Sequence, residues 1–190
     1  MSLDALDARF PNQRAIITGG ASGLGLATAQ LLAARGWSLG LLDRDAERLT
    51  EAVQQLRAKG SPLCEAHIVD TTDERAVKAA IDGFAATCGG LDFAMNSAGV
   101  AVAGDLLETS TADWRWILDI NVMGIVYSCR AELPHMIESG GGLVINVASA
   151  AAYLFSAHIS LYAAGKAGLL AYTRSLAAEL ASRKIRVNAI

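Results

Sequence analysis

The sequence predicts an α/β fold in which a doubly wound parallel sheet lies between two layers of helices. Short apolar runs alternate with longer amphipathic stretches along the whole chain, which is the order typical of βαβ units. Glycine closes several of the predicted helices, as at Gly36 and Gly60, where a left-handed residue is favoured. Hydrophobic residues make up 53% of the 190 residues and charged residues 18%, a composition that excludes a disordered chain.

Strands and helices alternate regularly in the first half of the chain. Runs such as RAIIT predict strands, and apolar spacing such as that of Leu49, Val53 and Leu56 predicts a helix with one buried face. The predicted strands are 14–18, 38–42, 63–69 and 91–95, and the predicted helices are 23–35, 45–59 and 73–88.

The second half predicts longer helices. One helix is expected over 111–138, capped by Ser110 or Thr111, and Pro134 should bend or end its regular part because proline lacks a backbone N–H. A strand over 142–148, an Ala/Leu-rich helix over 160–182 and a strand over 185–190 follow. The length suits one domain, 1–190. Because the last apolar strand stops at the end of the sequence, we expect a C-terminal part to be missing.

Charge, hydropathy and cysteine content exclude several classes of protein. The 16 Lys and Arg against 19 Asp and Glu give a net charge of −3, which argues against a nucleic-acid-binding protein. No apolar run reaches the length of a membrane span, about 18 residues, and the first ten residues lack a signal-peptide core. Three scattered cysteines form no zinc motif. The expectation is a cytoplasmic protein without a metal site.

Candidate functional residues follow five predicted strands at one edge of the sheet. In an open parallel sheet, ligands bind beyond the carboxyl ends of the strands. The segment 18–25, Asp43, Asp70, the segment 96–99 and Ser149 all follow strands in this way. Scattered polar residues would not gather at one edge, so the sequence predicts a binding site there.

The first of these segments is a glycine-rich turn between a strand and a helix. Gly19, Gly23 and Gly25 are spaced G-x-x-x-G-x-G, which is neither the strict dinucleotide fingerprint nor a P-loop. Glycines let a pyrophosphate approach the amides of a helix N-terminus; the alternative is an ordinary turn. Asp43 lies 24 residues beyond Gly19, where a carboxylate binds a ribose 2′-OH or merely caps a helix. It favours NAD over NADP, although Arg44 could accommodate a 2′-phosphate.

Taken together, the motifs resemble those of the short-chain dehydrogenase/reductase (SDR) family. They occur in the family's order, from about Arg14 to Ile190: the glycine turn, Asn96-Ser97-Ala98-Gly99, Asn121, Ser149, and Tyr162-x-x-x-Lys166. The resemblance implies a Rossmann-like three-layer αβα fold and a catalytic tetrad of Asn121, Ser149, Tyr162 and Lys166. The cofactor-binding residues that we expect are Gly19, Ser22, Gly23, Leu24, Gly25, Asp43, Asp70, Thr71, Asn96, Ala98, Gly99, Tyr162 and Lys166. Ser97, Ala148 and Gly165 depart from the usual family pattern.

Tyr162 and Lys166 are four residues apart on a predicted helix and therefore share a face. A free tyrosine has a pKa of about 10 and is a weak base at neutral pH, and an ammonium about 4 Å away favours the phenolate by roughly 4 kcal/mol in a partly shielded site. The resemblance implies that Tyr162 is the general acid/base and that Ser149 donates a hydrogen bond to the substrate oxygen. It also implies that Lys166 lowers the pKa of Tyr162 and binds the nicotinamide ribose, and that Asn121 binds a water that relays protons. Each residue alone has an ordinary structural explanation.

The function expected is therefore an NAD(P)-dependent oxidoreductase of an alcohol or ketone, with NAD more favoured than NADP. The alternatives are an epimerase or dehydratase of the extended SDR branch, and a nucleotide-binding scaffold or redox sensor without turnover. Tyr153 and His158 could border the substrate pocket. The helices 114–130 and 160–182 are apolar on more than one side, which, with the family resemblance, predicts a homo-dimer or homo-tetramer.

Overall fold

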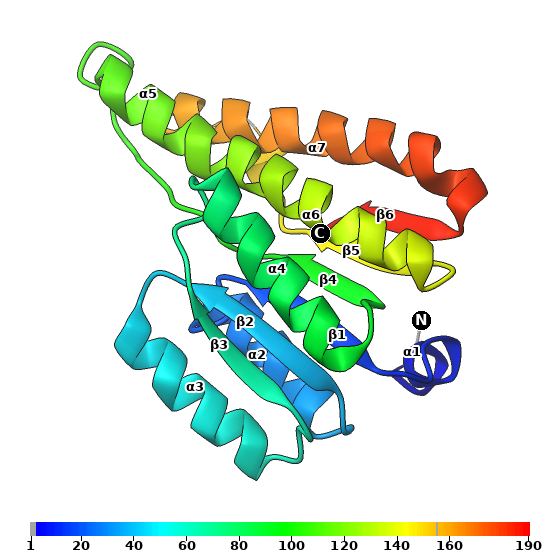
Figure 1. The fold of residues 1–190 in the computed structure, drawn as a ribbon. Coiled ribbons are helices and arrows are strands. Elements are labelled where there is room, and N and C mark those ends of the chain that lie inside the picture. The colour runs from blue at the N-terminus through cyan, green and yellow to red at the C-terminus, as the bar shows by residue number, and fades with distance from the viewer. Residues whose placement is uncertain (1–2, 155) are drawn as a thin grey trace.

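A computed structural model describes residues 3–154 and 156–190, and its centre is a six-stranded parallel sheet (Figure 1). The strand order is β3-β2-β1-β4-β5-β6. The chain starts at β1, moves outward to β3, and returns to β4 on the other side of β1, so the doubly wound α/β prediction is confirmed. The strands are β1 Arg14–Thr18, β2 Ser38–Asp43, β3 Cys64–Ile68, β4 Phe93–Asn96, β5 Gly142–Asn146 and β6 Ile185–Ala189.

Helices cover both faces of this sheet. One face packs on α1, α2 and α3, and the other on α4, α6 and α7. Successive strand residues alternate between the faces, as Ile16 and Ile17 do in β1, because side chains in a strand point to opposite sides. The helices are α1 Leu3–Arg9, α2 Gly23–Ala33, α3 Ala46–Ala58, α4 Glu74–Cys88, α5 Thr111–Leu118, α6 Gly124–Glu138 and α7 Ser160–Leu180.

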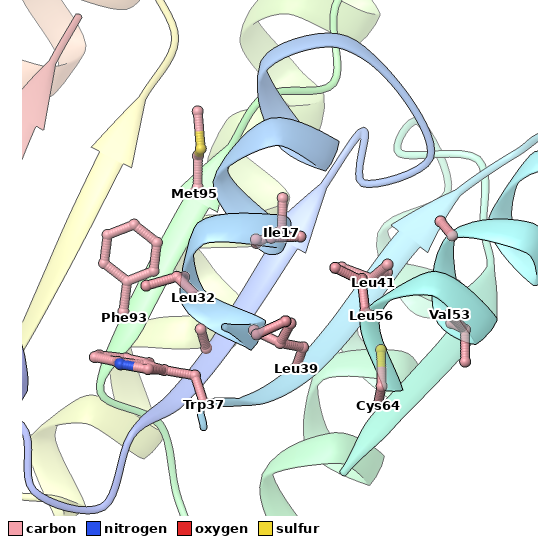
Figure 2. Packing of buried hydrophobic residues seen from close by; sticks show 14 of the residues in the cluster. Ile17, Leu32, Trp37, Leu39, Leu41, Val53, Leu56, Cys64, Phe93 and Met95 are labelled. Carbon is pink, nitrogen blue, oxygen red and sulfur yellow. The ribbon is translucent and has the colours of Figure 1, made fainter. Parts of the chain in front are cut away.

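The face that carries α2 has a dense apolar core (Figure 2). Trp37 is completely buried, and its ring meets that of Phe93 edge-on, with centroids 6.2 Å apart. Gly40 is required on the opposite face, because a Cβ there would lie 2.7 Å from the Phe84 ring. This packing fixes the strands whose ends form the site.

The predicted long helix exists, but it is interrupted at a different place from the one expected. Of the two predicted caps, Ser110 is the one observed, and it forms a capping box with Asp113. A π-helical turn, Asp119–Met123, separates α5 from α6. Pro134 lies inside α6 and does not end it, since the helix continues to Glu138.

Other differences from the sequence prediction are small. The helix α1 was not predicted; it places Leu6 and Phe10 in the core. Asp45 and Asp73 cap their helices from outside, each accepting a backbone N–H. The strand β5 ends at Asn146, so Val147 to Ser149 belong to the following loop. No helix in the described part of the chain is long and apolar enough to cross a bilayer.

Candidate active site

A cavity of about 440 Å³ lies at the carboxyl edge of the sheet. Segments that follow β1, β2, β3 and β4 contribute to its wall, where β1 and β4 are neighbours and the chain reverses its direction across the sheet. This is the position at which doubly wound folds bind nucleotides. The predicted cofactor residues on the wall are Gly19, Ser22, Gly23, Leu24, Asp43, Asp70, Thr71, Ala98 and Gly99.

The glycine turn brings backbone unusually close to backbone. Gly19 has φ +65°, and a Cβ there would lie 2.8 Å from the amide nitrogen of Ala98. A Cβ on Gly25 would collide with the Gly19 carbonyl; Gly25 is buried and is not part of the cavity wall. Gly25 therefore lets the turn fold tightly, whereas Gly19 and Gly23 form the surface of the cavity.

The helix α2 begins directly at this turn. Ser22 is its N-cap, its side chain caps no backbone amide, and the first turn contains no acidic residue. The N-terminus of a helix carries a partial positive charge and unpaired N–H groups, which suit a phosphate. The residues present therefore fit the pyrophosphate of a dinucleotide.

Two carboxylates on the wall are already positioned by backbone amides. Asp43 accepts the N–H of Ala21 at 3.1 Å and that of Asp45 at 3.2 Å, which joins the end of β2 to the glycine turn. Asp70 accepts the N–H of Thr72 at 2.9 Å and its hydroxyl at 2.8 Å. These hydrogen bonds lower the pKa of Asp70. Both side chains thus present fixed acceptors at the cavity.

Two arginines share the wall with Asp43. Arg44 is exposed, and Arg48, which the sequence analysis did not single out, lies 3.4 Å from Asp45 in an ion pair. Asp43 would repel a 2′-phosphate, whereas either arginine could attract one. The wall therefore has features that favour each of the two nicotinamide cofactors.

Lys166 is the buried cation of the site. It lies on α7 with only 4% of its surface exposed, and its Nζ donates a hydrogen bond of 2.7 Å to the carbonyl of Val147. Burial lowers the pKa of the Lys166 ammonium. The same Nζ lies 5.8 Å from the centre of the Tyr162 ring, so the predicted pair shares one face of the helix.

Asn121 lies in the π-helical turn and is completely buried. Its side-chain amide donates to the carbonyl of Val100 at 2.8 Å and accepts the N–H of Val100 at the same distance. A Cβ on Gly99 would lie 3.1 Å from Asn121 Oδ1 and 3.5 Å from Lys166 Nζ. Asn121 therefore braces the segment after β4 beside the lysine.

Ser149 begins a short 3₁₀ turn, Ala150–Ala152, two residues after the carbonyl that holds Lys166. Its Oγ accepts the N–H of Ala151 at 3.1 Å. With that lone pair occupied, the hydroxyl hydrogen is available to donate to another oxygen. This is the polarity needed to hold a carbonyl or alcohol oxygen of a substrate.

The remaining predicted residues occupy supporting positions. Asn96 is fully buried at the end of β4 and does not line the cavity. The Tyr153 hydroxyl accepts a hydrogen bond from Arg174 at 2.7 Å, and the His158 carbonyl accepts the N–H of Gly104 at 2.8 Å. His158 has φ +63° and is exposed. These contacts tie the loops around Ser149 to α7 and to the segment after β4.

Sequence reasoning missed the backbone groups of the site, and packing explains one of the departures that it noted, Gly165. The Val147 and Val100 backbone groups carry no sequence signal, because every residue has them. Gly165 allows close approach, since a Cβ there would lie 3.4 Å from Ile117 and 4.0 Å from the Cβ of Asn121. Its position directly before Lys166 was the available clue. Within residues 3–154 and 156–190, no group of three His, Cys, Asp or Glu could hold a metal ion.

Comparison with known proteins identifies the family of this chain. Residues 13–190 match the family model for short chain dehydrogenases. The chain is 33% identical over 185 residues to 3-oxoacyl-[acyl-carrier-protein] reductase FabG of Chlamydia pneumoniae, covering 97% of this chain and 74% of that protein. It is 37% identical over 190 residues to D-threitol dehydrogenase of Mycolicibacterium smegmatis, covering 100% of this chain and 72% of that protein.

Solved structures agree in fold. An NAD+-bound xylitol dehydrogenase superposes with a TM-score of 0.90 at 32% identity, over 94% of this chain and 68% of that one. L-Sorbose reductase of Gluconobacter frateurii, solved with NADPH and L-sorbose, gives a TM-score of 0.89 at 32% identity, over 93% of this chain and 67% of that one. Relatives named as dehydrogenases and reductases do not favour the scaffold alternative. The chain belongs to the short-chain dehydrogenase/reductase family and is an NAD(P)-linked oxidoreductase acting on CH–OH groups.

Proposed function

We propose that Tyr162 is the general acid/base of this oxidoreductase, that NAD is its preferred cofactor, and that its substrate is a small alcohol or ketone. The observation that carries the proposal is the placement of a buried ammonium, Lys166, 5.8 Å from the Tyr162 ring. A cation within about 6 Å of a ring centroid makes a cation–π contact, which holds the Tyr162 ring and the Lys166 ammonium together at one place. Tyr162 can then take the proton of a substrate hydroxyl, or return it to a carbonyl oxygen.

The other residues of the site orient the reacting groups. Ser149 donates its free hydroxyl hydrogen to the substrate oxygen and holds it beside Tyr162. Lys166 is held by the Val147 carbonyl and would also donate to the ribose hydroxyls of a bound nicotinamide cofactor. Asn121 keeps the segment after β4 in place, and a water held near it relays the proton to solvent. Bound nicotinamide supplies the hydride acceptor or donor.

The cavity wall supports a dinucleotide cofactor. The pyrophosphate fits against the glycine turn and the N-terminus of α2, where a Cβ on Gly19 could not be accommodated. Asp43, fixed by the amides of Ala21 and Asp45, accepts the ribose 2′-OH and repels a 2′-phosphate. This arrangement supports NAD over NADP, and the finer cofactor choice rests on Asp43.

The assembly and location that we propose rest on exposed apolar side chains and on free thiols. Apolar side chains remain exposed along α5 and α6, including Trp116, Leu118 and Ile137, which suits burial between copies in a homo-dimer or homo-tetramer. Cys64, Cys88 and Cys129 are free thiols, which suits the reducing cytoplasm. Residues 1–190 then act as one cofactor-binding domain. Light scattering of the purified protein measures the assembly directly.

The experiment that tests the proposed chemistry is the substitution Tyr162→Phe. Removing the hydroxyl should lower turnover of a responsive alcohol by about 10²–10⁴-fold, the usual contribution of a general acid/base, while the NADH dissociation constant changes little. Tyr127→Phe is the matched control, since Tyr127 is a half-buried tyrosine packed on the α4, α6 and α7 side of the sheet. A Tyr162→Phe variant with wild-type turnover would refute the assignment.

A further inference from the structure

Behind the site, the fold buries a carboxyl group that the reaction does not use. Glu132 lies on α6 with 0% of its surface exposed. One carboxyl oxygen, Oε2, accepts a hydrogen bond from Nδ2 of Asn96 at 3.2 Å. Its other oxygen, Oε1, and the side-chain oxygen of Asn96 are both buried without a hydrogen-bond partner among the described residues. Two residues already in contact thus each keep an unsatisfied acceptor.

Glu132 is connected to the point where two catalytic segments leave the sheet. Asn96 also donates to Oδ1 of Asn146 at 3.0 Å, and these two asparagines are register partners at the last positions of β4 and β5. Asn146 in turn donates to the Thr173 hydroxyl on α7 at 3.0 Å. The next residues along the chain are Ser97, which lines the cavity, and Val147, whose carbonyl holds Lys166.

The groups around Glu132 leave a negative charge without compensation. Cys129 on the same helix and Tyr172 on α7 face it, and burial raises the pKa of both, so both stay neutral. Glu179 on α7 lies near Tyr172 and helps to raise the pKa of its hydroxyl; as a carboxylate it supplies no positive charge to Glu132. On α4, Asp82 is occupied by Lys78 and His135. Within the described chain, no Lys, Arg or His forms an ion pair with Glu132.

A neutral carboxylic acid would satisfy the pair that a carboxylate leaves open. A carboxylic acid and a primary amide are complementary, because the amide N–H donates to the carboxyl oxygen while the acid O–H donates to the amide oxygen. The first of these hydrogen bonds is present between Asn96 and Glu132. The unpaired atoms, Glu132 Oε1 and Asn96 Oδ1, are those that the second would use.

We propose that Glu132 is a positioning residue, held as a neutral acid, which fixes the ends of β4 and β5 through Asn96 and thereby the cavity wall and the Lys166 anchor. The proposal rests on the proposed function for its effect on the cofactor site, but not for its effect on stability. When Glu132 loses its proton, the acid–amide pair breaks, Asn96 is left with an unsatisfied oxygen, and the cofactor should bind more weakly.

The pH dependence of stability follows from the direction in which folding shifts the pKa of Glu132. Burial raises the pKa of Glu132 to about 8, whereas a glutamate in an unfolded chain titrates at about 4.3. The folded state therefore holds this proton more tightly. The stability linked to it is fully present below the unfolded pKa, is lost as the pH rises through the folded pKa, and changes no further above it.

The test compares wild type with E132Q and, as a control for removal of a charge, E138Q at the exposed end of the same helix. The melting temperature and the NADH dissociation constant, measured by fluorescence without turnover, are followed from about pH 6 to about pH 9.5. Wild type and E138Q should lose stability with rising pH, and their NADH affinity should fall about fivefold, the value of one neutral hydrogen bond. The amide of E132Q can donate and accept hydrogen bonds but cannot ionise. This variant should therefore lack the losses of stability and of NADH affinity that come from the Glu132 carboxyl. It should be more stable than wild type at the alkaline end of the range.

Each other outcome is decisive. If the melting temperature of E132Q falls with pH as steeply as that of wild type, Glu132 is not held as a neutral acid. If the melting temperature of E132Q does not change with pH but its NADH affinity falls as in wild type, Glu132 does not position the cofactor site. Titration of Lys166 affects both proteins equally and cancels in the comparison. Should E132Q not fold, infrared spectra of wild type decide: a protonated carboxyl band at neutral pH that disappears as NADH affinity falls supports the proposal, and its absence overturns it. Both readouts are independent of Tyr162, so a failure here is distinct from a failure of the proposed chemistry.

Discussion

A cation is buried at each of the two edges of the sheet, and the two cations differ in the groups that accept their hydrogen bonds. At the amino edge, Arg14 begins β1 and donates to Asp92 at 2.9 Å and 2.8 Å. It also donates to the Gly89 carbonyl and to the Ser139 hydroxyl. At the carboxyl edge, Lys166 is equally buried, but the hydrogen bond it makes is to the neutral carbonyl of Val147.

The difference indicates which edge is built for binding. Hollows of about 440 and 450 Å³ lie at the carboxyl and amino edges, so size does not distinguish them. A buried cation with a bidentate carboxylate is satisfied by the protein itself. A buried cation with a neutral acceptor keeps a charge that can act on another group, and we propose that for Lys166 this group is Tyr162, whose ring centre lies 5.8 Å from Nζ. Incomplete pairing, rather than burial or volume, marks the functional edge.

The substitution with the largest expected effect on stability is Arg14→Met, which breaks the closed edge. Asp92 would be left as a buried charge without its partner, which costs about 3–5 kcal/mol of unfolding free energy. Denaturant unfolding measures the loss, and the NADH dissociation constant of the folded fraction should not change. The double variant Arg14→Met with Asp92→Leu should recover most of the loss. A single variant as stable as wild type would show that the pair is not structural.

A smaller effect is expected from Gly19→Ala at the open edge. The new methyl group would lie 2.8 Å from the Ala98 nitrogen on a residue with φ +65°, at a cost of about 2–3 kcal/mol of unfolding free energy. Gly23→Ala is the matched control, because Gly23 has φ +53° and nothing within 4 Å of its Cβ position. It should cost only about 1 kcal/mol, for the backbone conformation alone. Equal losses in the two variants would contradict the close approach of Gly19 to Ala98.

The smallest of these effects concerns cofactor choice. Asp43→Asn should shift the ratio of NAD to NADP affinity toward NADP by about tenfold, equivalent to roughly 1.4 kcal/mol, because the repulsive carboxylate is gone while Arg44 and Arg48 remain. Parallel titrations with the two reduced cofactors measure the ratio. Asp45→Asn on the same wall is the control and should change it less. An unchanged ratio in Asp43→Asn would remove Asp43 from cofactor selection.

The parts of the fold that depend on local periodicity could be predicted from the sequence. Alternating apolar runs located all six strands, and the capping residues Ser110 and Thr111 located the start of the long helix. The helix α1 was not predicted because its seven residues carry too short a pattern. It is held by tertiary contacts: the packing of Leu6 and the hydrogen bond that Trp37 donates to Asp7 at 2.8 Å. The π-helical turn carries Asn121, which is hydrogen-bonded to Val100 in both directions; this long-range contact has no local sequence pattern.

For the site, the sequence indicated which side chains gather but not how they are held. The order of strands brings Gly19, Asp43 and Asp70 to one cavity, as predicted. Which groups are satisfied could not be predicted, because backbone acceptors such as the Val147 carbonyl look alike in every sequence. The burial of Glu132 was likewise hidden, since a glutamate on a helix is usually solvent-exposed. Its position beside Asn96 arises only from the packing of α6 on β4.

The central claim is that Lys166 is buried to act on Tyr162 and not to stabilise the fold, and Lys166→Met tests it directly. Burial lowers the pKa of Lys166, so at neutral pH its charge costs stability, and removing it should offset the lost hydrogen bond to Val147. The unfolding free energy should stay within about 1 kcal/mol of wild type, while turnover falls by about 10²-fold or more. A variant destabilised as strongly as Arg14→Met, with wild-type turnover per folded molecule, would contradict the account.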